Sequence, residues 1–462
     1  MLDLVKLAAG RGVKASVITS PENLPRFRRT LPADLPIHLL EVDVDLDTDG
    51  QTENPNSTSS PLSSSDAATR TLAILHPLAD DLVRCHRPDA IISDLNLPWT
   101  AQISRKYGIP RIVFHSTSCF ALCISQCIGA YRPHEGVNSD YEAFPVPGLP
   151  EPVHITKSDM PTGVFNEPGL QELFGLFAEA DQNTYGAVMA NTFSELEPKY
   201  VEHFEKSSKK KVWPVGPVSL CNMVERGNRS SIDKDRCLTW LDGKQSKSVI
   251  YVCFGSLCVF TQSQLVEIGL GLEASNCNFI WVIRDISGAG TGADEALREL
   301  EERVKGRGRI IKGWAPQVLI LNHPAVGGFV THCGWNSVVE AVVAGVPMVT
   351  WPLANEQFYN QIFVLEQLKI GIGIGVNTRL KCGEKEEAGA IVKRGRVAEV
   401  VAQLMGGGEM VREMQERAST LSELARAAVK EGGSSYLNLE DLIEDLLRER
   451  ASGKAYLQDS NA

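Results

Sequence analysis

Short apolar stretches alternate with stretches of helical spacing along most of the chain. Residues Leu2–Ala9 have the spacing of an amphipathic helix, and the β-branched residues of Val13–Thr19 then predict a strand. The alternation continues up to residue 215, a pattern typical of a parallel sheet covered by helices. The further strands predicted in this part are Ile37–Val44, Ala90–Ser93, Arg111–His115, Gly186–Asn191 and Val212–Val215.

The same alternation restarts after a break. Residues 216–235 are rich in Pro, Gly, Asn and Ser and have no clear periodicity, so we interpret them as a linker. We therefore predict an α/β fold with two doubly wound domains, 1–215 and 236–462. Helical spacing over Arg396–Arg450, interrupted at Gly406–Gly408, predicts that the second domain ends in separate helices. The strands predicted in it are Ser248–Phe254, Phe279–Ile283, Arg309–Lys312, Gly328–Val330 and Pro347–Thr350.

The net charge and the cysteine spacing disfavour several kinds of binding partner and site. A net charge of -11 and a pI of about 5.4 disfavour nucleic acid and anionic lipid as partners. No window approaches the ~20 apolar residues of a membrane span and no basic leader is visible, so we predict a cytoplasmic protein without stable membrane insertion, and a monomer. The eleven cysteines form no CxxC pair, which favours free thiols. His323, His332 and Cys333 lack zinc-ligand spacing, so no metal is predicted.

Three polar or glycine-containing segments follow predicted strands of the second domain. They are Phe254–Leu257, Gly313–Gln317 and Thr331–Ser337. Ligands of open α/β sheets bind at the carboxyl ends of the strands, so these segments are expected to form one site.

The segment Thr331–Ser337 carries the strongest chemical signal. Gly334 permits close approach of the backbone, and Asn336 and Ser337 stand at a helix start, where N–H groups and the helix dipole favour phosphate. His332 can donate a hydrogen bond to the same group. A helix cap is the alternative for Asn336 or Ser337 alone, but it does not explain the His, Trp, Asn and Ser together in one turn.

Residues 314–357, from Trp-Ala-Pro-Gln to Asn-Glu-Gln, closely resemble the plant secondary-product glycosyltransferase box. The similarity extends over nearly the whole chain, including Ser93-Asp94, Val215–Val218 and Tyr251–Leu257. The resemblance implies a GT-B fold of two facing Rossmann-like domains, with the final helices packing back toward the first domain. It also implies metal-independent, inverting transfer of a sugar from a UDP-sugar to a small hydroxylated acceptor.

The resemblance further implies a role for each residue of the box that matches the family pattern. Packing in the core is the alternative for Trp314 and Trp335. A Gln at the end of the box, here Gln357, is usual in enzymes that prefer UDP-glucose. For the nucleoside, the implied roles are uracil stacking for Trp314, backbone hydrogen bonds for Ala315, a place near uracil and ribose for Gln317, and acceptance from the ribose hydroxyls for Glu340. For the rest of the donor, they are diphosphate binding for Ser256, His332, Asn336 and Ser337, and sugar contacts for Trp335, Glu356 and Gln357.

The catalytic base of this family, a histidine after the first strand, has no counterpart in the sequence. Asp94 matches the aspartate that orients that histidine. Because Met1–Leu7 resembles the helix that follows the histidine, we expect an N-terminally truncated chain with an incomplete first sheet and weak or no activity. His115 is expected in the acceptor pocket or in packing, and Ser116 is a weak candidate for a sugar contact.

Two other functional classes stay open from the sequence. A non-catalytic UDP-sugar-binding protein would explain the missing histidine. A nicotinamide oxidoreductase is disfavoured, because Gly288–Gly292 lacks the G-x-G-x-x-G spacing. Family members act on flavonoids, terpenoids, steroids or phenols, and Phe114–Phe120 resembles a branch with flavonoid and triterpenoid acceptors.

Overall fold

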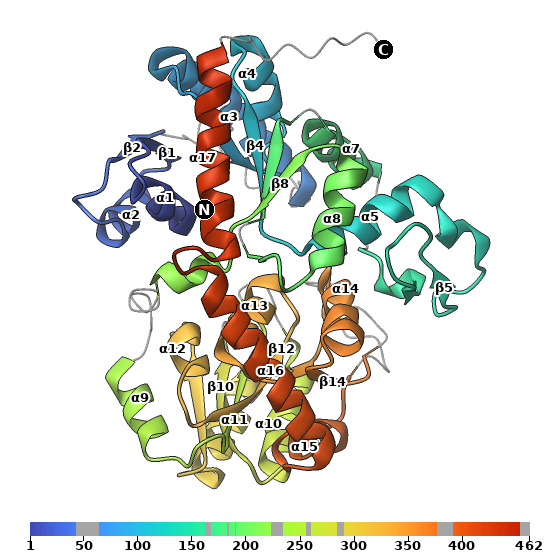
Figure 1. Cartoon of the computed structure of the whole chain (residues 1–462). Coiled ribbons are helices and arrows are strands. Elements are labelled where there is room, and N and C mark those ends of the chain that lie inside the picture. The colour runs from blue at the N-terminus through green and yellow to red at the C-terminus, as the bar shows by residue number, and fades with distance from the viewer. Residues whose placement is uncertain are drawn as a thin grey trace, which may run out of the picture.

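The computed structural model describes residues 1–42, 64–161, 168–182, 184–189, 191–222, 234–255, 260–283, 291–376 and 391–452. Two sets of parallel strands, each with helices around it, lie one above the other in Figure 1. Strands of the first set come from the N-terminal half of the chain, and those of the second from the C-terminal half. The predicted linker falls largely on residues 223–233, outside the described ranges, so the boundaries at 215 and 236 stay predictions.

The second domain contains one six-stranded sheet in the order β11-β10-β9-β12-β13-β14. All its pairings are parallel, and β9 and β10 are buried almost throughout, as continuous apolar strands in such sheets are. The five strands predicted here are present. The strands are β9 Val249–Cys253, β10 Asn278–Ile283, β11 Gly308–Lys312, β12 Val326–Thr331, β13 Met348–Thr350 and β14 Gly371–Gly373.

Helices cover both faces of this sheet. The core beneath them joins apolar residues of the strands to the inward faces of the helices. The helices are α9 Lys234–Asp242, α10 Gln262–Ala274, α11 Thr291–Arg303, α12 Gln317–Leu321, α13 Trp335–Ala344, α14 Gln357–Ile362, α15 Arg394–Met405 and α16 Glu409–Ala428.

The first domain has its main strands in two separate sheets. β1 (Ala15–Thr19) and β2 (Ile37–Glu41) form a two-stranded parallel sheet. A four-stranded parallel sheet has the order β3-β4-β7-β8. These strands are β3 Ile91–Asp94, β4 Arg111–His115, β7 Gly186–Met189 and β8 Lys211–Pro214. The helices around both sheets are α1 Leu2–Ala9, α2 Leu24–Thr30, α3 Ser64–His86, α4 Trp99–Tyr107, α5 Cys119–Tyr131, α7 Pro168–Gln182 and α8 Pro198–Ser208.

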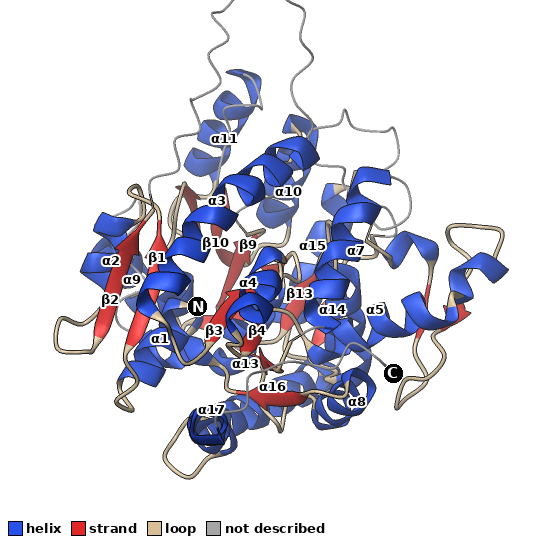
Figure 2. Cartoon of the chain, turned by 90° about the horizontal axis from the view of Figure 1, so that it is seen from above, coloured by secondary structure: helices blue, strands red, loops and turns tan. Residues whose placement is uncertain are grey.

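No described strand of the first domain takes the place that β9 takes in the second. In the second sheet β9 lies centrally, between β10 and β12, whereas nothing in the described residues joins β1 to β3. Burial reflects this difference, because Ile18 in β1 is 43% exposed while every residue of β4 is buried. Figure 2 shows β1 and β2 set apart from β3 and β4.

The last helix, α17 (Ser434–Ser452), lies against the first domain, although it follows the helices of the second. Trp213 Nε1 in β8 donates to the Asp441 carboxylate at 2.9 Å, and Asn438 Nδ2 donates to the Pro214 carbonyl at 2.8 Å. The turn before α17 contains Gly433, where a Cβ would lie 2.2 Å from the Ala427 carbonyl oxygen.

The described helices include none with the length and apolar character needed to cross a bilayer. The nine cysteines in the described ranges are free thiols.

Candidate functional site

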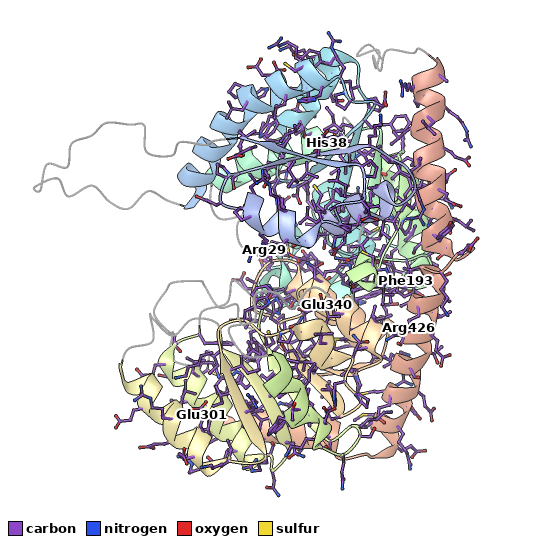
Figure 3. All side chains as sticks on the ribbon, turned by 90° about the vertical axis from the view of Figure 1, so that its left-hand side faces the viewer. Arg29, His38, Phe193, Glu301, Glu340 and Arg426 are labelled. Carbon is purple, nitrogen blue, oxygen red and sulfur yellow. The ribbon has the colours of Figure 1, made fainter. Side chains whose placement is uncertain are left out.

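The predicted site residues gather at the carboxyl ends of parallel strands in the second sheet. Gly255 follows β9, Trp314 follows β11, His332 follows β12, and Gln357 stands beyond β13 at the start of α14. Figure 3 shows Glu340, in α13, where the second domain meets the first. Four strands therefore contribute to one edge of the sheet, as the sequence predicted for these segments.

Two glycines enclose the ring of His332. A Cβ at Gly255, which has φ +77°, would lie 2.6 Å from the ring, and a Cβ at Gly334 would lie 2.4 Å from its Nε2. Any larger residue at either place would displace the imidazole. His332 Nδ1 is buried without a hydrogen-bond partner among the described residues. Burial lowers the pKa of His332 to about 4, so the free site holds a neutral imidazole at pH 7.

Helix α13 begins without a side-chain cap. Its N-cap residue is Gly334, whose carbonyl accepts from Ser337 N at 2.9 Å. Asn336 is exposed and its Oδ1 accepts from Asn191 Nδ2 in the first domain, while Ser337 Oγ accepts from Gln317 Nε2 at 3.1 Å. Neither side chain therefore takes the capping role left open by the sequence, and the positive end of the helix is available to an anion.

Gln317, the first residue of α12, links β9 to helix α13. Its Nε2 donates to Glu340 Oε2 at 2.8 Å, and its Oε1 accepts from the Tyr251 hydroxyl at 3.3 Å. The backbone N–H of Gln317 donates to the carbonyl of Ala315, which is buried. The side chains predicted to contact uracil and ribose thus lie together beside the start of α13.

Trp314 is a large apolar side chain left 37% exposed. Gly313 before it has φ +104°, and its N–H donates to the Ile283 carbonyl at 2.7 Å, which turns the chain at the end of β11. Core packing, the alternative for this residue, does not describe a ring with this much exposed surface.

Gln357 has its amide oriented by the loop before it. Its Oε1 accepts from the backbone N–H groups of Leu353 and Ala354 at 2.9 and 3.0 Å, which leaves the Nε2 donor for another partner. Glu356 is half-buried, and burial raises the pKa of its carboxyl. The site therefore has an oriented amide donor, on Gln357, next to a carboxyl group with a raised pKa, on Glu356.

Trp335, the first residue of α13, is buried. Its side chain is 2% exposed, and its Nε1 donates to the Asn191 carbonyl at 2.9 Å. Its ring centroid lies 5.9 Å from that of Phe363. The ring of Trp335 therefore packs in the contact between the domains, and the sugar contact expected for this residue stays a prediction.

His115 also packs in the interior. It is 2% exposed, its Nε2 lies 3.4 Å from Asp181 Oδ1, and its ring meets the edge of Phe204 at 5.8 Å. Ser116 beside it is exposed. Asp94, half-buried, ends β3, and its Oδ1 accepts from the backbone N–H of Asn96 at 3.0 Å. Ser256 lies outside the described residues.

Two polar residues that contact the site, Asn191 and Asn360, were not predicted from the sequence. Asn191 bonds both Asn336 and Trp335, while Asn360 joins the turn after β12 to Ser118 of the first domain. Asn360 carried no local signal, because it lies within an ordinary helix pattern. Asn191 ends the predicted strand Gly186–Asn191 and lies in the turn after β7, so its place as a polar residue at a strand end was a readable signal. In the described ranges, His, Cys, Asp and Glu side chains form no group of three or more that could hold a metal ion.

Comparisons with known proteins identify relatives of this chain. A family model described as "UDP-glucoronosyl and UDP-glucosyl transferase" matches residues 180–378. UDP-glycosyltransferase 73C12 of Barbarea vulgaris is 41% identical, over 97% of this chain and 93% of that protein. UDP-glycosyltransferase 73C3 of Arabidopsis thaliana is 40% identical with the same two coverages. The crystal structure of Glycyrrhiza uralensis UGT73P12, complexed with glycyrrhetinic acid 3-O-monoglucuronide, superposes with a TM-score of 0.88 at 36% identity, over 98% of this chain and 93% of that one.

Proposed function

The chain belongs to the plant family 1 UDP-glycosyltransferases, and we propose that it moves glucose from UDP-glucose to a hydroxyl of a small plant metabolite. The observation that carries the proposal is the uncapped start of α13, beside a neutral His332 held between two glycines. Uncapped N–H groups and the helix dipole are suited to the diphosphate of the donor.

The remaining parts of the nucleotide have partners at the same sheet edge. The half-exposed ring of Trp314 suits stacking on uracil, and the Glu340 carboxylate accepts from the ribose hydroxyls. Gln317 already donates to Glu340 and orients that carboxylate. Glucose as the sugar rests on the resemblance, in which a Gln at the position of Gln357 is usual in enzymes that prefer UDP-glucose. The Oε1 of Gln357 is held by two backbone N–H groups, which leaves its Nε2 to donate to the sugar.

The acceptor hydroxyl attacks the anomeric carbon of the sugar as the bond to UDP breaks, which inverts that centre. The negative charge that develops on UDP is stabilised by the start of α13. The acceptor proton must pass to a base; the resemblance implies a histidine oriented by the aspartate that Asp94 matches, and the described residues place no histidine beside Asp94. The acceptor class is a flavonoid, terpenoid or phenol, by analogy with the small-molecule glycoside in the Glycyrrhiza structure. We place the enzyme in the cytoplasm as a monomer.

A non-catalytic UDP-sugar-binding protein is the second candidate. It is favoured by the surroundings of Asp94, whose Oδ1 accepts from the Asn96 backbone, while His115 pairs with Asp181 instead. In the described residues, Asp94 therefore orients no histidine. The donor site lies in the second domain and is the same under either function.

Calorimetric titration with UDP, combined with a UDP-release assay over a panel of flavonoids, terpenoids and phenols, separates the two functions. Binding together with acceptor-dependent release supports the transferase, while binding without release supports the binding protein. Absence of UDP binding contradicts both.

A further inference from the structure

A buried amide side chain connects the turn after β12 to the first domain. Asn360, in α14, is fully buried. Its Nδ2 donates to the Cys333 carbonyl at 2.9 Å, and its Oδ1 accepts from Ser118 Oγ at 3.1 Å. The Asn360 amide can adopt only this orientation, because the flipped amide would place its Oδ1, which cannot donate, against the Cys333 carbonyl oxygen.

Asn360 and its two hydrogen bonds form a bridge from Cys333 to Ser118, and Cys333 has an unfavourable backbone conformation. Cys333 has φ +63°, a left-handed conformation that non-glycine residues seldom adopt. Its carbonyl belongs to the planar peptide unit that also contains the N–H of Gly334, the residue that precedes α13. Since C=O and N–H point in opposite directions in a trans peptide, the bond from Asn360 aims the Gly334 N–H away from α14.

At the other end of the bridge, hydrogen bonds at the start of α5 fix the position of the Ser118 hydroxyl. Ser118 is fully buried and is the N-cap of α5, where its Oγ accepts from Ala121 N at 3.0 Å. The Glu197 carboxylate accepts from the next two backbone N–H groups, of Cys119 and Phe120, at 3.0 and 2.9 Å. The hydroxyl proton of Ser118 is therefore directed to Asn360 by a rigid helix start in the first domain.

The bridge lies in apolar surroundings. The ring of Phe363 in the second domain is 5.1 Å from that of Phe120 and 5.9 Å from that of Trp335. Removing one partner in such a place leaves another polar group buried and unpaired, which costs more than the bond itself contributes.

We propose that Asn360 is a positioning residue for donor binding. It holds the Cys333–Gly334 peptide in the orientation that presents the Gly334 N–H and the start of α13 to the diphosphate, and Ser118 of the first domain orients its amide. This inference rests on the proposed binding of a UDP-sugar. It predicts that donor affinity depends on Ser118 of the first domain, which among the described residues is linked to the donor site by its hydrogen bond to Asn360.

The test uses the full chain and UDP as the probe, measured by calorimetry. Asn360→Ala and Asn360→Asp are each expected to weaken UDP binding about tenfold, because neither side chain can donate to the Cys333 carbonyl. Ser118→Ala is expected to weaken it about threefold, and to have no further effect when Asn360 is already alanine. That loss of additivity distinguishes action through Asn360 from general destabilisation.

Two matched controls accompany these variants. Asn438→Ala removes a comparable amide-to-carbonyl bond between α17 and β8, and Thr261→Ala removes the side-chain cap of α10, as Ser118→Ala does for α5. Both are expected to bind UDP within twofold of the wild type. Wild-type affinity in Asn360→Asp and in Ser118→Ala overturns the inference, and so does a Ser118→Ala effect that persists in the Asn360→Ala background. Failure of the wild type itself to bind UDP refutes the proposed function instead, so the two failures are distinguishable.

Discussion

Replacement of Trp314 by alanine removes the apolar surface that the site offers to a base. The side chain is 37% exposed, which for a tryptophan of up to about 250 Å² leaves roughly 90 Å² to be covered by uracil. At about 25 cal/mol per Å², covering that surface contributes about 2 kcal/mol, within the range of about 1–3 kcal/mol for base–aromatic stacking. We therefore expect Trp314→Ala to raise the Kd for UDP about 30-fold.

Calorimetry with ligand fragments makes this prediction specific. Uridine binding should be lost in Trp314→Ala, while binding of inorganic pyrophosphate should stay near its wild-type value, because the start of α13 is unchanged. Trp314→Phe keeps a smaller flat ring and should lie between the wild type and Trp314→Ala. Tyr141→Ala, which removes a side chain that is 62% exposed in the first domain, should bind UDP as the wild type does. Equal affinity of Trp314→Ala and the wild type for uridine would refute the stacking role.

Three further predictions follow from the site and the sheets. Glu340→Ala should weaken UDP binding about tenfold but leave the affinity for 2′,3′-dideoxy-UDP unchanged, since that ligand has no ribose hydroxyl to donate. Equal losses of affinity for the two ligands, measured by calorimetry, would rule out the ribose contact. The folded-state pKa of His332 is about 4, below its ordinary value of 6.5, so the unfolded chain binds more protons than the folded chain between these pH values. The stability linked to this group is therefore complete above pH 6.5 and is lost as the pH falls toward 4. In urea unfolding, the free energy of unfolding should drop less from pH 7 to pH 5 in His332→Gln than in the wild type, and an identical drop would contradict a buried neutral imidazole. Backbone amides of β1 and β2 should exchange hydrogen faster than those of β9 and β12, because the two-stranded sheet has unpaired edges and a half-exposed Ile18. Equal protection of both sets of amides in a hydrogen-exchange experiment would show that the two-stranded sheet is as stable as the six-stranded one.

The strand ends that build the site could be predicted from the sequence because their signals are local. An apolar run followed by glycine and polar residues marks the ends of β9, β11 and β12, and parallel topology then brings these ends to one edge. β14 escaped prediction because it is short and contains Gly371 and Gly373. The break before α17 at Gly432 and Gly433 was missed too, although the two adjacent glycines were a readable signal.

Side-chain roles that depend on contacts between the domains could not be predicted in this way. Trp335 stands in a polar turn, yet its ring is buried because Asn191, distant in sequence, accepts from its Nε1. Likewise, the direction of the Asn360 amide depends on Ser118, on a helix of the other domain. No periodicity along the chain encodes such pairs, because each arises only when the two domains pack together.

A crystal structure of the chain with bound UDP tests the donor site most directly. We expect the uracil ring over Trp314, the ribose hydroxyls at Glu340, and the diphosphate at the first N–H groups of α13 next to His332. A nucleotide bound elsewhere, or a diphosphate turned away from α13, would contradict the proposed site.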